Sequence, residues 1–238
     1  MALKSHIEWT GSSWNPITGC SKISTGCVNC YAEKMAKRLQ AMGNPRYKNG
    51  FNVMFHPDVL DEPLKWKKPQ IIFVCSMSDI FHDSVSDEHI TKVFEVMNKA
   101  ERHIFQVLTK RSERLTKLSL KLTWSDNIWM GVTVESQKHT YRIDDLAKVP
   151  SKIKFLSIEP LLSDIPNLPL ESIDWVIVGG ESGAGARAVK QEWVRNIRDK
   201  CVSQAIPFFF KQWGGFNKKA AGKMLDGRVW DEMPIALQ

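Results

Sequence analysis

Three cysteines lie close together near the start of the chain, where Cys20, Cys27 and Cys30 form a C-x6-C-x2-C array. Thiolates bind zinc or iron–sulfur clusters, and both need several sulfur ligands. The two other cysteines, Cys75 and Cys201, lie in apolar stretches and are expected to be buried hydrophobic residues. An odd number of cysteines with three of them clustered argues against a disulfide framework and favours a metal site in a reducing compartment.

The number of thiols bears on which metal they hold. A closed tetrahedral zinc site needs a fourth ligand, and the candidates His6, His56 and His82 stand at no usual finger spacing from a cysteine. A four-iron cluster held by three cysteines leaves one iron free to bind a cofactor. The array therefore favours an iron–sulfur cluster, with structural zinc and unligated core cysteines as the alternatives.

The elements that position these thiols follow from the hydrophobic pattern. Short apolar runs predict seven strands, at 14–18, 71–77, 104–109, 129–134, 154–158, 175–178 and 207–211. Amphipathic stretches between several of them predict helices. Strands that are apolar throughout and separated by helices indicate a parallel sheet. Because there are too few units for a full eight-unit barrel, we expect an α/β fold, a partial (β/α)6-type barrel of mostly parallel strands, as a single domain over residues 1–238.

Two segments depart from this alternation. Residues 43–70 contain four prolines and are expected to form an insertion. Residues 213–238 carry Gly-Gly and Asp-Gly turn signals and are expected to form a C-terminal hairpin or lid.

Polar residues follow the apolar part of each predicted strand. With the glycines and the tryptophan that accompany them, the residues at these strand ends are Ser76, Ser78, Asp79, His82, Thr109, Lys110, Arg111, Thr133, Glu135, Ser157, Glu159, Gly179, Gly180, Glu181, Ser182, Lys211, Gln212 and Trp213. Because the carboxyl ends of parallel strands form the ligand crevice of such folds, these groups are expected to converge on one site. The cysteine array follows the first strand and belongs to the same edge.

Several of these residues have both a functional and a structural interpretation. The pair Gly179-Gly180 lets a backbone approach a ligand, and Glu181 can accept a hydrogen bond from an ammonium group, but a tight turn with a surface Glu181 is the alternative. Asp79 and His82 could contact ribose or substrate, or be a helix-start aspartate and a surface histidine.

Two glutamates end strands that are expected to be buried. Glu135 and Glu159 therefore need partners, because a buried carboxylate is costly when it is unpaired. The candidate partners are Lys110, Arg111, Arg187 and Lys211. Structural ion pairs and ligand binding remain open for both glutamates.

The composition suits an acidic partner. The formal net charge is +7 and the pI is about 9.1, as in many nucleic-acid-binding proteins, although many others share this balance. The insertion is basic and aromatic, through Arg46, Lys48, Lys65, Trp66, Lys67 and Lys68. It is a candidate nucleic-acid surface, with a solvated charged surface as the alternative. No apolar leader and no run of about 18 apolar residues occurs, so we expect a cytoplasmic protein without membrane contact.

Ordered blocks of sequence carry a resemblance to a known family. They are EWTGSSWNPITGCSKISTGCVNCYAE, FVCSMSDIFHDSV, FQVLTKRSERL, WMGVTVES, FLSIEPLL, DWVIVGGESG and PFFFKQWGG. On these blocks the chain resembles the phage and mobile-element three-cysteine-motif family, radical S-adenosylmethionine-like proteins distantly similar to spore photoproduct lyase. The usual radical-enzyme spacing is C-x3-C-x2-C with an aromatic residue before the last cysteine. Here the first gap is six residues, and Asn29 holds the aromatic position.

The resemblance implies a cofactor and a reaction. Cys20, Cys27 and Cys30 would hold three irons of a [4Fe-4S] cluster, and S-adenosylmethionine would chelate the fourth. Reductive cleavage of S-adenosylmethionine would give a 5′-deoxyadenosyl radical, with the cofactor supplying the chemistry. A nucleobase in DNA or RNA is the expected substrate, and a reductase or flavodoxin-type protein the expected electron donor.

Roles at the strand ends complete this interpretation. The cofactor-binding residues are predicted to be Ser76, Ser78, Glu135, Gly179, Gly180 and Glu181. The catalytic residues are predicted to be Asp79, Glu159 and Lys211. The alternatives are a nonenzymatic nucleic-acid or protein-binding protein with a structural metal, and a polar S-adenosylmethionine enzyme.

Overall fold

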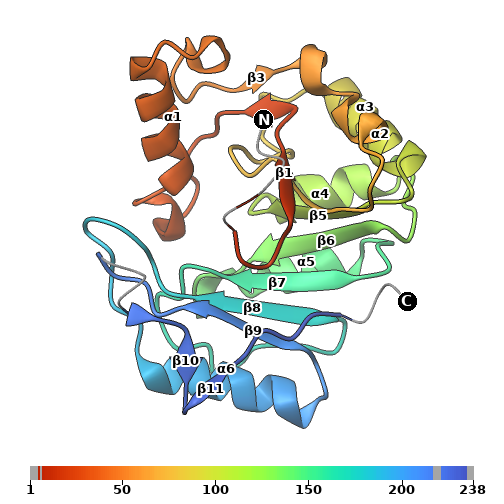
Figure 1. Ribbon diagram of the computed structural model, residues 1–238. Coiled ribbons are helices and arrows are strands. Elements are labelled where there is room, and N and C mark those ends of the chain that lie inside the picture. The colour runs from red at the N-terminus through yellow and green to blue at the C-terminus, as the bar shows by residue number, and fades with distance from the viewer. Residues whose placement is uncertain (1–4, 6, 217–220, 235–238) are drawn as a thin grey trace.

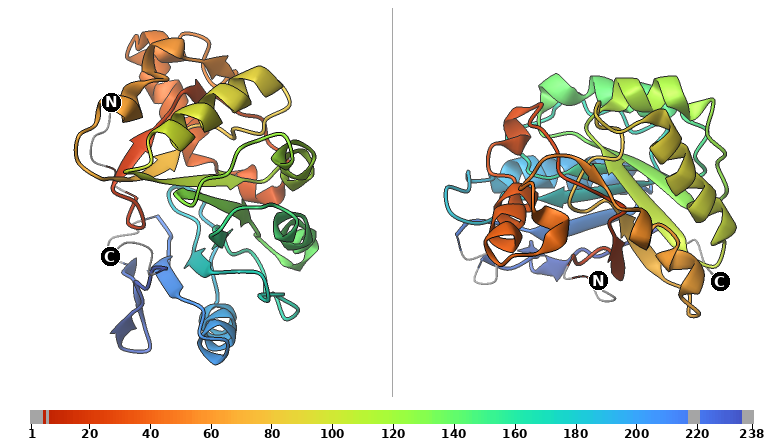
Figure 2. Two further views of the ribbon diagram at one scale, coloured as in Figure 1. Left: turned by 90° about the vertical axis from the view of Figure 1, so that its right-hand side faces the viewer. Right: turned by 90° about the horizontal axis from the view of Figure 1, so that it is seen from above.

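A parallel sheet of seven strands forms the centre of the protein. The computed structural model describes residues 5, 7–216 and 221–234. In sheet order the strands are β1 (Ser12–Trp14), β4 (Ile71–Val74), β5 (Ile104–Thr109), β6 (Ile128–Thr133), β7 (Lys154–Ile158), β8 (Trp175–Gly179) and β9 (Phe208–Gln212). All six neighbouring pairs are parallel, and the sheet curls into a half-barrel (Figures 1 and 2). The predicted α/β partial barrel is confirmed.

Helices connect most of these strands. The α-helices are α1 (Tyr31–Ala41), α2 (Glu62–Lys65), α3 (Asp87–Lys99), α4 (Ser112–Ser119), α5 (Tyr141–Ala147) and α6 (Gln191–Ser203). The 3-10 helices are η1 (Thr25–Cys27), η2 (Pro45–Tyr47), η3 (Pro57–Val59) and η4 (Gln137–His139). At α3, the Ser86 side chain accepts a hydrogen bond from the His89 backbone N–H at 3.2 Å, which caps the helix. None of the described helices has the length and apolar character needed to cross a membrane.

The core occupies both faces of the sheet because successive side chains of a strand point to opposite sides. One face packs against α3, α4, α5 and α6. The other carries a cluster rich in aromatic residues, named here the aromatic cluster, which consists of Trp9, Phe73, Ile104, Trp129, Phe155, Trp175, Ile177 and Phe209. Gly131 leaves room for this cluster, since a Cβ there would lie 2.5 Å from the Phe155 ring. Several of the tryptophans are therefore core residues.

The structure corrects two strand boundaries. The first predicted strand, 14–18, is divided into β1 and the short strand β2 (Ile17–Thr18). Between them lies Pro16, which lacks the N–H group that a continuing ladder needs. The predicted strand 71–77 ends at Val74, because Cys75 adopts a positive φ of 59° and turns the chain.

The two segments outside the alternation also have structure. Within residues 43–70, β3 (Met54–Phe55) pairs antiparallel with β2. Near the C-terminus, β10 (Met224–Leu225) and β11 (Arg228–Val229) form an antiparallel hairpin. Its turn contains Asp226 and Gly227 with φ of 54° and 75°, as expected for an Asp-Gly hairpin turn. The predicted hairpin is thus present, while 217–220 and 235–238 lie outside the described residues.

Candidate functional site

The three clustered cysteines lie on one segment, residues 19–30, named here the thiol loop. It runs from the end of β2 through η1 to α1, and Cys30 is the residue before the first turn of α1. Gly19 pairs with Ser78, which follows β4, so the loop lies at the carboxyl edge of the sheet. Cys20, Cys27 and Cys30 are each partly exposed, and none forms a disulfide.

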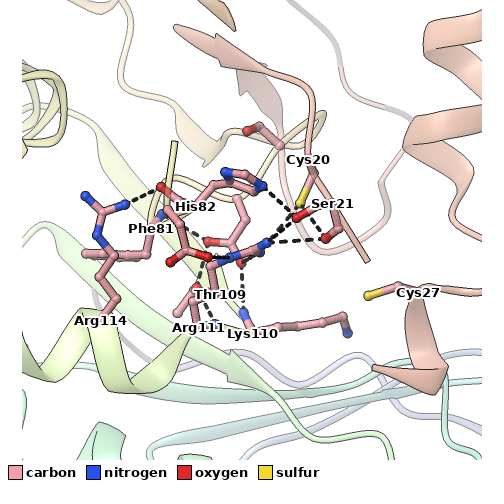
Figure 3. Close-up of polar contacts among 12 residues, drawn as sticks. Cys20, Ser21, Cys27, Phe81, His82, Thr109, Lys110, Arg111 and Arg114 are labelled. Atoms are coloured by element: carbon pink, nitrogen blue, oxygen red, sulfur yellow. Dashed lines mark hydrogen bonds and ion pairs between the residues drawn. The ribbon is translucent and has the colours of Figure 1, made fainter. Parts of the chain in front are cut away.

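The loops after β4 and β5 bind the first part of the thiol loop (Figure 3). The Arg111 guanidinium donates to the Ser21 carbonyl at 3.3 Å and to the Ser21 hydroxyl at 3.0 Å. The same guanidinium lies 3.6 Å from Cys20 Sγ. His82 Nε2 lies 2.7 Å from the Ser21 hydroxyl. A buried cation therefore stands beside the first thiol.

Asp79 holds this arginine in place. Its carboxylate lies 3.4 Å from Arg111 Nη1. It also accepts hydrogen bonds from the Thr109 hydroxyl at 2.7 Å, the Lys110 N–H at 3.0 Å and the Phe81 N–H at 3.0 Å. Because protein donors surround this buried carboxylate, it positions the loops around Cys20.

Glu135, after β6, contacts the middle of the thiol loop. Its Oε1 accepts a short hydrogen bond from the Ser24 hydroxyl and lies 3.2 Å from Lys110 Nζ. Its Oε2 lies 2.7 Å from Arg142 Nη1 and 3.4 Å from His139 Nδ1. Burial alone would raise the pKa of Glu135, but the positive charges of Lys110 and Arg142 outweigh it and hold the pKa at about 2. This carboxylate is therefore ionised and fully paired.

Glu181, after β8, contacts the end of the thiol loop. It accepts from Arg187 Nη2 at 2.5 Å and Nε at 2.9 Å, and from Asn29 Nδ2 at 2.9 Å. Arg187 Nη2 also donates to the Thr25 carbonyl at 3.0 Å. Burial would raise the pKa of Glu181, but the hydrogen bonds from Arg187 and Asn29 hold it at about 2. The buried Glu181 thus differs from the surface residue of the alternative interpretation.

The two glycines before Glu181 have different surroundings. A Cβ at Gly180 would lie 1.9 Å from the Trp213 carbonyl oxygen, so this glycine permits a close approach of two backbone segments. A Cβ at Gly179 would lie 3.3 Å from Cδ of Glu159. Gly179 therefore borders the ion pair formed by Glu159 with Lys211.

That ion pair joins two strand ends. Lys211 Nζ lies 2.6 Å from Glu159 Oε1, and both side chains are mostly buried. The pairing of β8 with β9 is irregular at this point, since Val178 pairs with Phe210 and Gly179 with Gln212. The predicted serines join the segment after β4 to the segments around β2, since the Ser76 hydroxyl donates to Asn15 Oδ1 at 3.1 Å and the Ser78 hydroxyl donates to the Gly19 carbonyl at 2.7 Å.

The thiols supply donors of the type and number that an iron–sulfur cluster requires. Burial raises the pKa of Cys20 to about 11. Burial acts in the same direction on Cys27, but backbone hydrogen bonds and the positive charge of Lys110 leave its pKa below the usual value. Among the residues that the structure describes, no group of three or more histidine, cysteine, aspartate or glutamate side chains is arranged to hold a metal ion. The donors thus fit the cluster by chemical type and number, although the three thiols do not form one ligand set among the described residues.

The remaining two cysteines lie away from the thiol loop, and the candidate histidines differ in where they lie. Cys75 and Cys201 are buried, as predicted, and burial raises the pKa of both thiols. His56 Nε2 lies 2.7 Å from the Thr18 hydroxyl. His82 contacts the thiol loop through Ser21, whereas His6 lies outside the described residues.

Sequence reasoning missed several residues of this edge. They are Ser24, Asn29, His139 and Arg142, all of which contact Glu135 or Glu181. Arg142 is a charged residue in a helix pattern, where a solvated position is the ordinary expectation. Only the observation that Glu135 needs a partner could have prompted a search for a second cation near it.

The half-barrel has counterparts among solved structures. The fold is similar to that of a cysteine-to-serine variant of spore photoproduct lyase, with a TM-score of 0.50 and 13% identity over 79% of this chain and 60% of that chain. A complex of that lyase with dinucleoside spore photoproduct gives a TM-score of 0.49 and 13% identity, over 78% and 59% of the two chains. A double variant with bound AdoMet and dinucleoside spore photoproduct gives 0.48 and 11%, over 79% and 60%. The chain spans about three fifths of the length of these structures.

The architecture and its polar edge thus define an α/β half-barrel with a fold similar to that of spore photoproduct lyase. Residues 4–234 match the family described as "Protein of unknown function (DUF5131)", and the chain belongs to this family. A search of curated proteins finds no match. The expected likeness to spore photoproduct lyase is confirmed for the fold, whereas the phage origin stays a prediction.

Proposed function

We propose that the protein is a radical S-adenosylmethionine enzyme in which Cys20, Cys27 and Cys30 hold a [4Fe-4S] cluster. One observation carries the proposal. Three unpaired thiols lie on a single loop at the carboxyl edge of a half-barrel, and buried charged residues from neighbouring strand ends bind that loop. Carboxyl edges are where parallel α/β folds bind their ligands. The similarity in fold to spore photoproduct lyase supports the same conclusion.

The chain's own residues would contribute binding and electrostatics. When bound, the cluster and S-adenosylmethionine would supply one-electron cleavage of the sulfonium. Arg111 places a positive charge 3.6 Å from Cys20 Sγ, which would offset the negative charge of a ligating thiolate. Asp79 keeps that guanidinium in place, so we assign it a positioning role in place of the catalytic role first predicted.

The other predicted residues divide between cofactor and substrate. We assign Gly179, Gly180 and Glu181 to the border of the cofactor site. Ser76 and Ser78, which follow β4 at the same edge, would border it from the other side. The ion pair of Glu159 with Lys211 would be the catalytic pair that faces the substrate, since its two groups are close enough to exchange a proton.

The proposed substrate is a nucleobase in DNA or RNA. The net charge of +7 favours a polyanionic partner. Spore photoproduct lyase, similar to this chain in fold alone, was solved with a dinucleoside photoproduct. A reductase or flavodoxin-type protein is the proposed electron donor.

Anaerobic reconstitution with iron and sulfide tests this function. We expect the wild-type protein to take up one four-iron cluster, whose electron paramagnetic resonance spectrum changes when S-adenosylmethionine is added. Reduction should then release 5′-deoxyadenosine. Replacing any one of Cys20, Cys27 and Cys30 by alanine should abolish cluster assembly, whereas the matched controls Cys75→Ala and Cys201→Ala should retain it.

Other outcomes would favour the rival functions. Full iron content in the Cys27→Ala variant would refute the ligand assignment. Tight zinc binding without iron would indicate a nonenzymatic binding protein with a structural metal. Release of S-adenosylhomocysteine in place of 5′-deoxyadenosine would indicate polar chemistry.

A further inference from the structure

Glu135 has no exposed surface, unlike the other buried carboxylates of the described residues, Asp79 and Glu181. Its two oxygens contact different groups. Oε1 faces the Ser24 hydroxyl and Lys110 Nζ, and Oε2 faces Arg142 and His139. A carboxylate with both oxygens engaged by buried or nearly buried donors has little capacity left for a ligand. This arrangement is typical of a carboxylate that holds neighbouring segments of the protein together.

A second contact between Glu135 and the thiol loop is steric. A Cβ added to Gly26 would lie 2.5 Å from Cγ of Glu135 and 2.6 Å from its Oε1. Such distances are far below van der Waals contact, so the loop backbone lies directly against this side chain. The glycine is required here by the close approach, independently of the Ser24 hydrogen bond.

Both contacts involve residues that lie just before Cys27 in the thiol loop. Ser24 and Gly26 lie before it, and the Cys27 N–H donates to the Ser24 carbonyl at 3.0 Å. The next N–H groups continue the turn, since Val28 donates to Thr25 at 3.3 Å and Cys30 donates to Cys27 at 3.3 Å. A group that fixes Ser24 and Gly26 therefore fixes where the second thiol lies relative to the first.

We infer that Glu135 is a positioning residue, which docks the middle of the thiol loop onto the end of β6. The inference gives Glu135 a role other than the predicted cofactor contact. It rests on the proposed function only in taking the loop as the metal-binding segment. The docking itself is a property of the metal-free chain and can be tested there.

Amide hydrogen exchange of the metal-free protein measures the docking directly. Ser24→Ala removes the hydrogen bond to the carboxylate, and Gly26→Ala places a Cβ against it. We expect each variant to increase exchange about tenfold in peptides that cover 24–30, since a hydrogen bond to a charged group is lost or its geometry is broken. Peptides from α3, residues 87–99, should exchange as in the wild type and show that the fold is retained.

Three further variants separate docking from a general effect of mutation. Ser24→Thr keeps the hydroxyl and should restore slow exchange. Ser203→Ala is the matched control, because among the described residues its hydroxyl donates to the Lys200 carbonyl within α6 and to no other group. In a Glu135→Ala background, Gly26→Ala should add nothing to the exchange rate, because the atoms that its Cβ would meet are gone.

The outcomes distinguish this inference from the proposed function. Exchange at the wild-type rate in both Ser24→Ala and Gly26→Ala would overturn the positioning role, whether or not the wild type binds iron. Faster exchange in both Ser24→Ala and Gly26→Ala, together with slow exchange in Ser24→Thr, would support the positioning role. This holds even if the wild type took up no iron. In reconstituted protein, a positioning role further predicts that Gly26→Ala lowers iron content and alters the electron paramagnetic resonance spectrum.

Discussion

Replacing Arg142 by methionine tests how much the buried ion pair beneath the thiol loop stabilises the fold. The guanidinium is almost fully buried and donates to Glu135 Oε2 at 2.7 Å and to the Thr133 carbonyl at 2.7 Å. Removing one partner of a buried pair costs about 3–5 kcal/mol. Because Lys110 and His139 still face Glu135, we expect the lower end, about 3 kcal/mol, or a roughly 150-fold smaller folding equilibrium constant.

Urea unfolding of the metal-free protein measures this loss. The double variant Glu135→Leu with Arg142→Met removes both charges and should recover most of the stability, since apolar replacements of a buried pair leave no unpaired charge. Lys110 can turn its ammonium to solvent, because its side chain is 18% exposed. Although its stability recovers, the double variant should bind iron poorly, because the Ser24 hydroxyl has lost the Glu135 carboxylate as its acceptor.

Arg38→Met on the exposed face of α1 is the control, with an expected change within about 0.5 kcal/mol. A loss below about 1 kcal/mol for Arg142→Met would show that the ion pair contributes little and would contradict the reasoning. So would a double variant less stable than Arg142→Met alone.

Two other predictions concern acid stability and polyanion binding. The folded-state pKa of Glu181 is about 2 and its ordinary value is 4.5, so its contribution to stability should be complete above pH 4.5 and be lost as the pH falls toward 2. In the Glu181→Gln variant the midpoint of urea unfolding should therefore depend less on pH over that range. A pH profile equal to that of the wild type would contradict the ion pair of Glu181 with Arg187. Replacing the three exposed lysines of the insertion together should weaken binding of single-stranded DNA in fluorescence anisotropy and reduce the salt slope by about 2, whereas unchanged affinity would remove the insertion from the interface. These lysines are Lys65, Lys67 and Lys68.

Much of the fold could be predicted because its signals are local. Apolar runs such as 104–109 and 154–158 coincide with β5 and β7, since a strand buried on both faces must be apolar along its length. The polar strand ends meet at one edge because the strands are parallel. The boundaries that failed depend on single backbone features, the proline at position 16 and the positive φ of Cys75.

The contacts within the candidate site could be predicted only in part. Lys110 and Lys211 were foreseen as partners of buried glutamates, and they lie 3.2 Å from Glu135 and 2.6 Å from Glu159. Which lysine meets which glutamate depends on the order of strands in space, which the sequence does not state. The close approach of Gly180 to the Trp213 backbone could not be predicted for the same reason, because it joins segments that are distant along the chain.

The aromatic cluster has a consequence for the size of ligand that the half-barrel can admit. Indole and phenyl rings of this cluster fill the face of the sheet opposite to helices α3, α4, α5 and α6, toward the amino-terminal ends of the strands. The rings of Trp175 and Phe155, for example, lie 5.6 Å apart between centroids. This filled face leaves no passage for a ligand through the half-barrel, so under the proposed function the substrate would approach at the carboxyl edge, where the thiol loop lies. A substrate held at an edge need not fit inside the half-barrel, so under the proposed function it would be free to be a long nucleic acid that presents one nucleotide at a time.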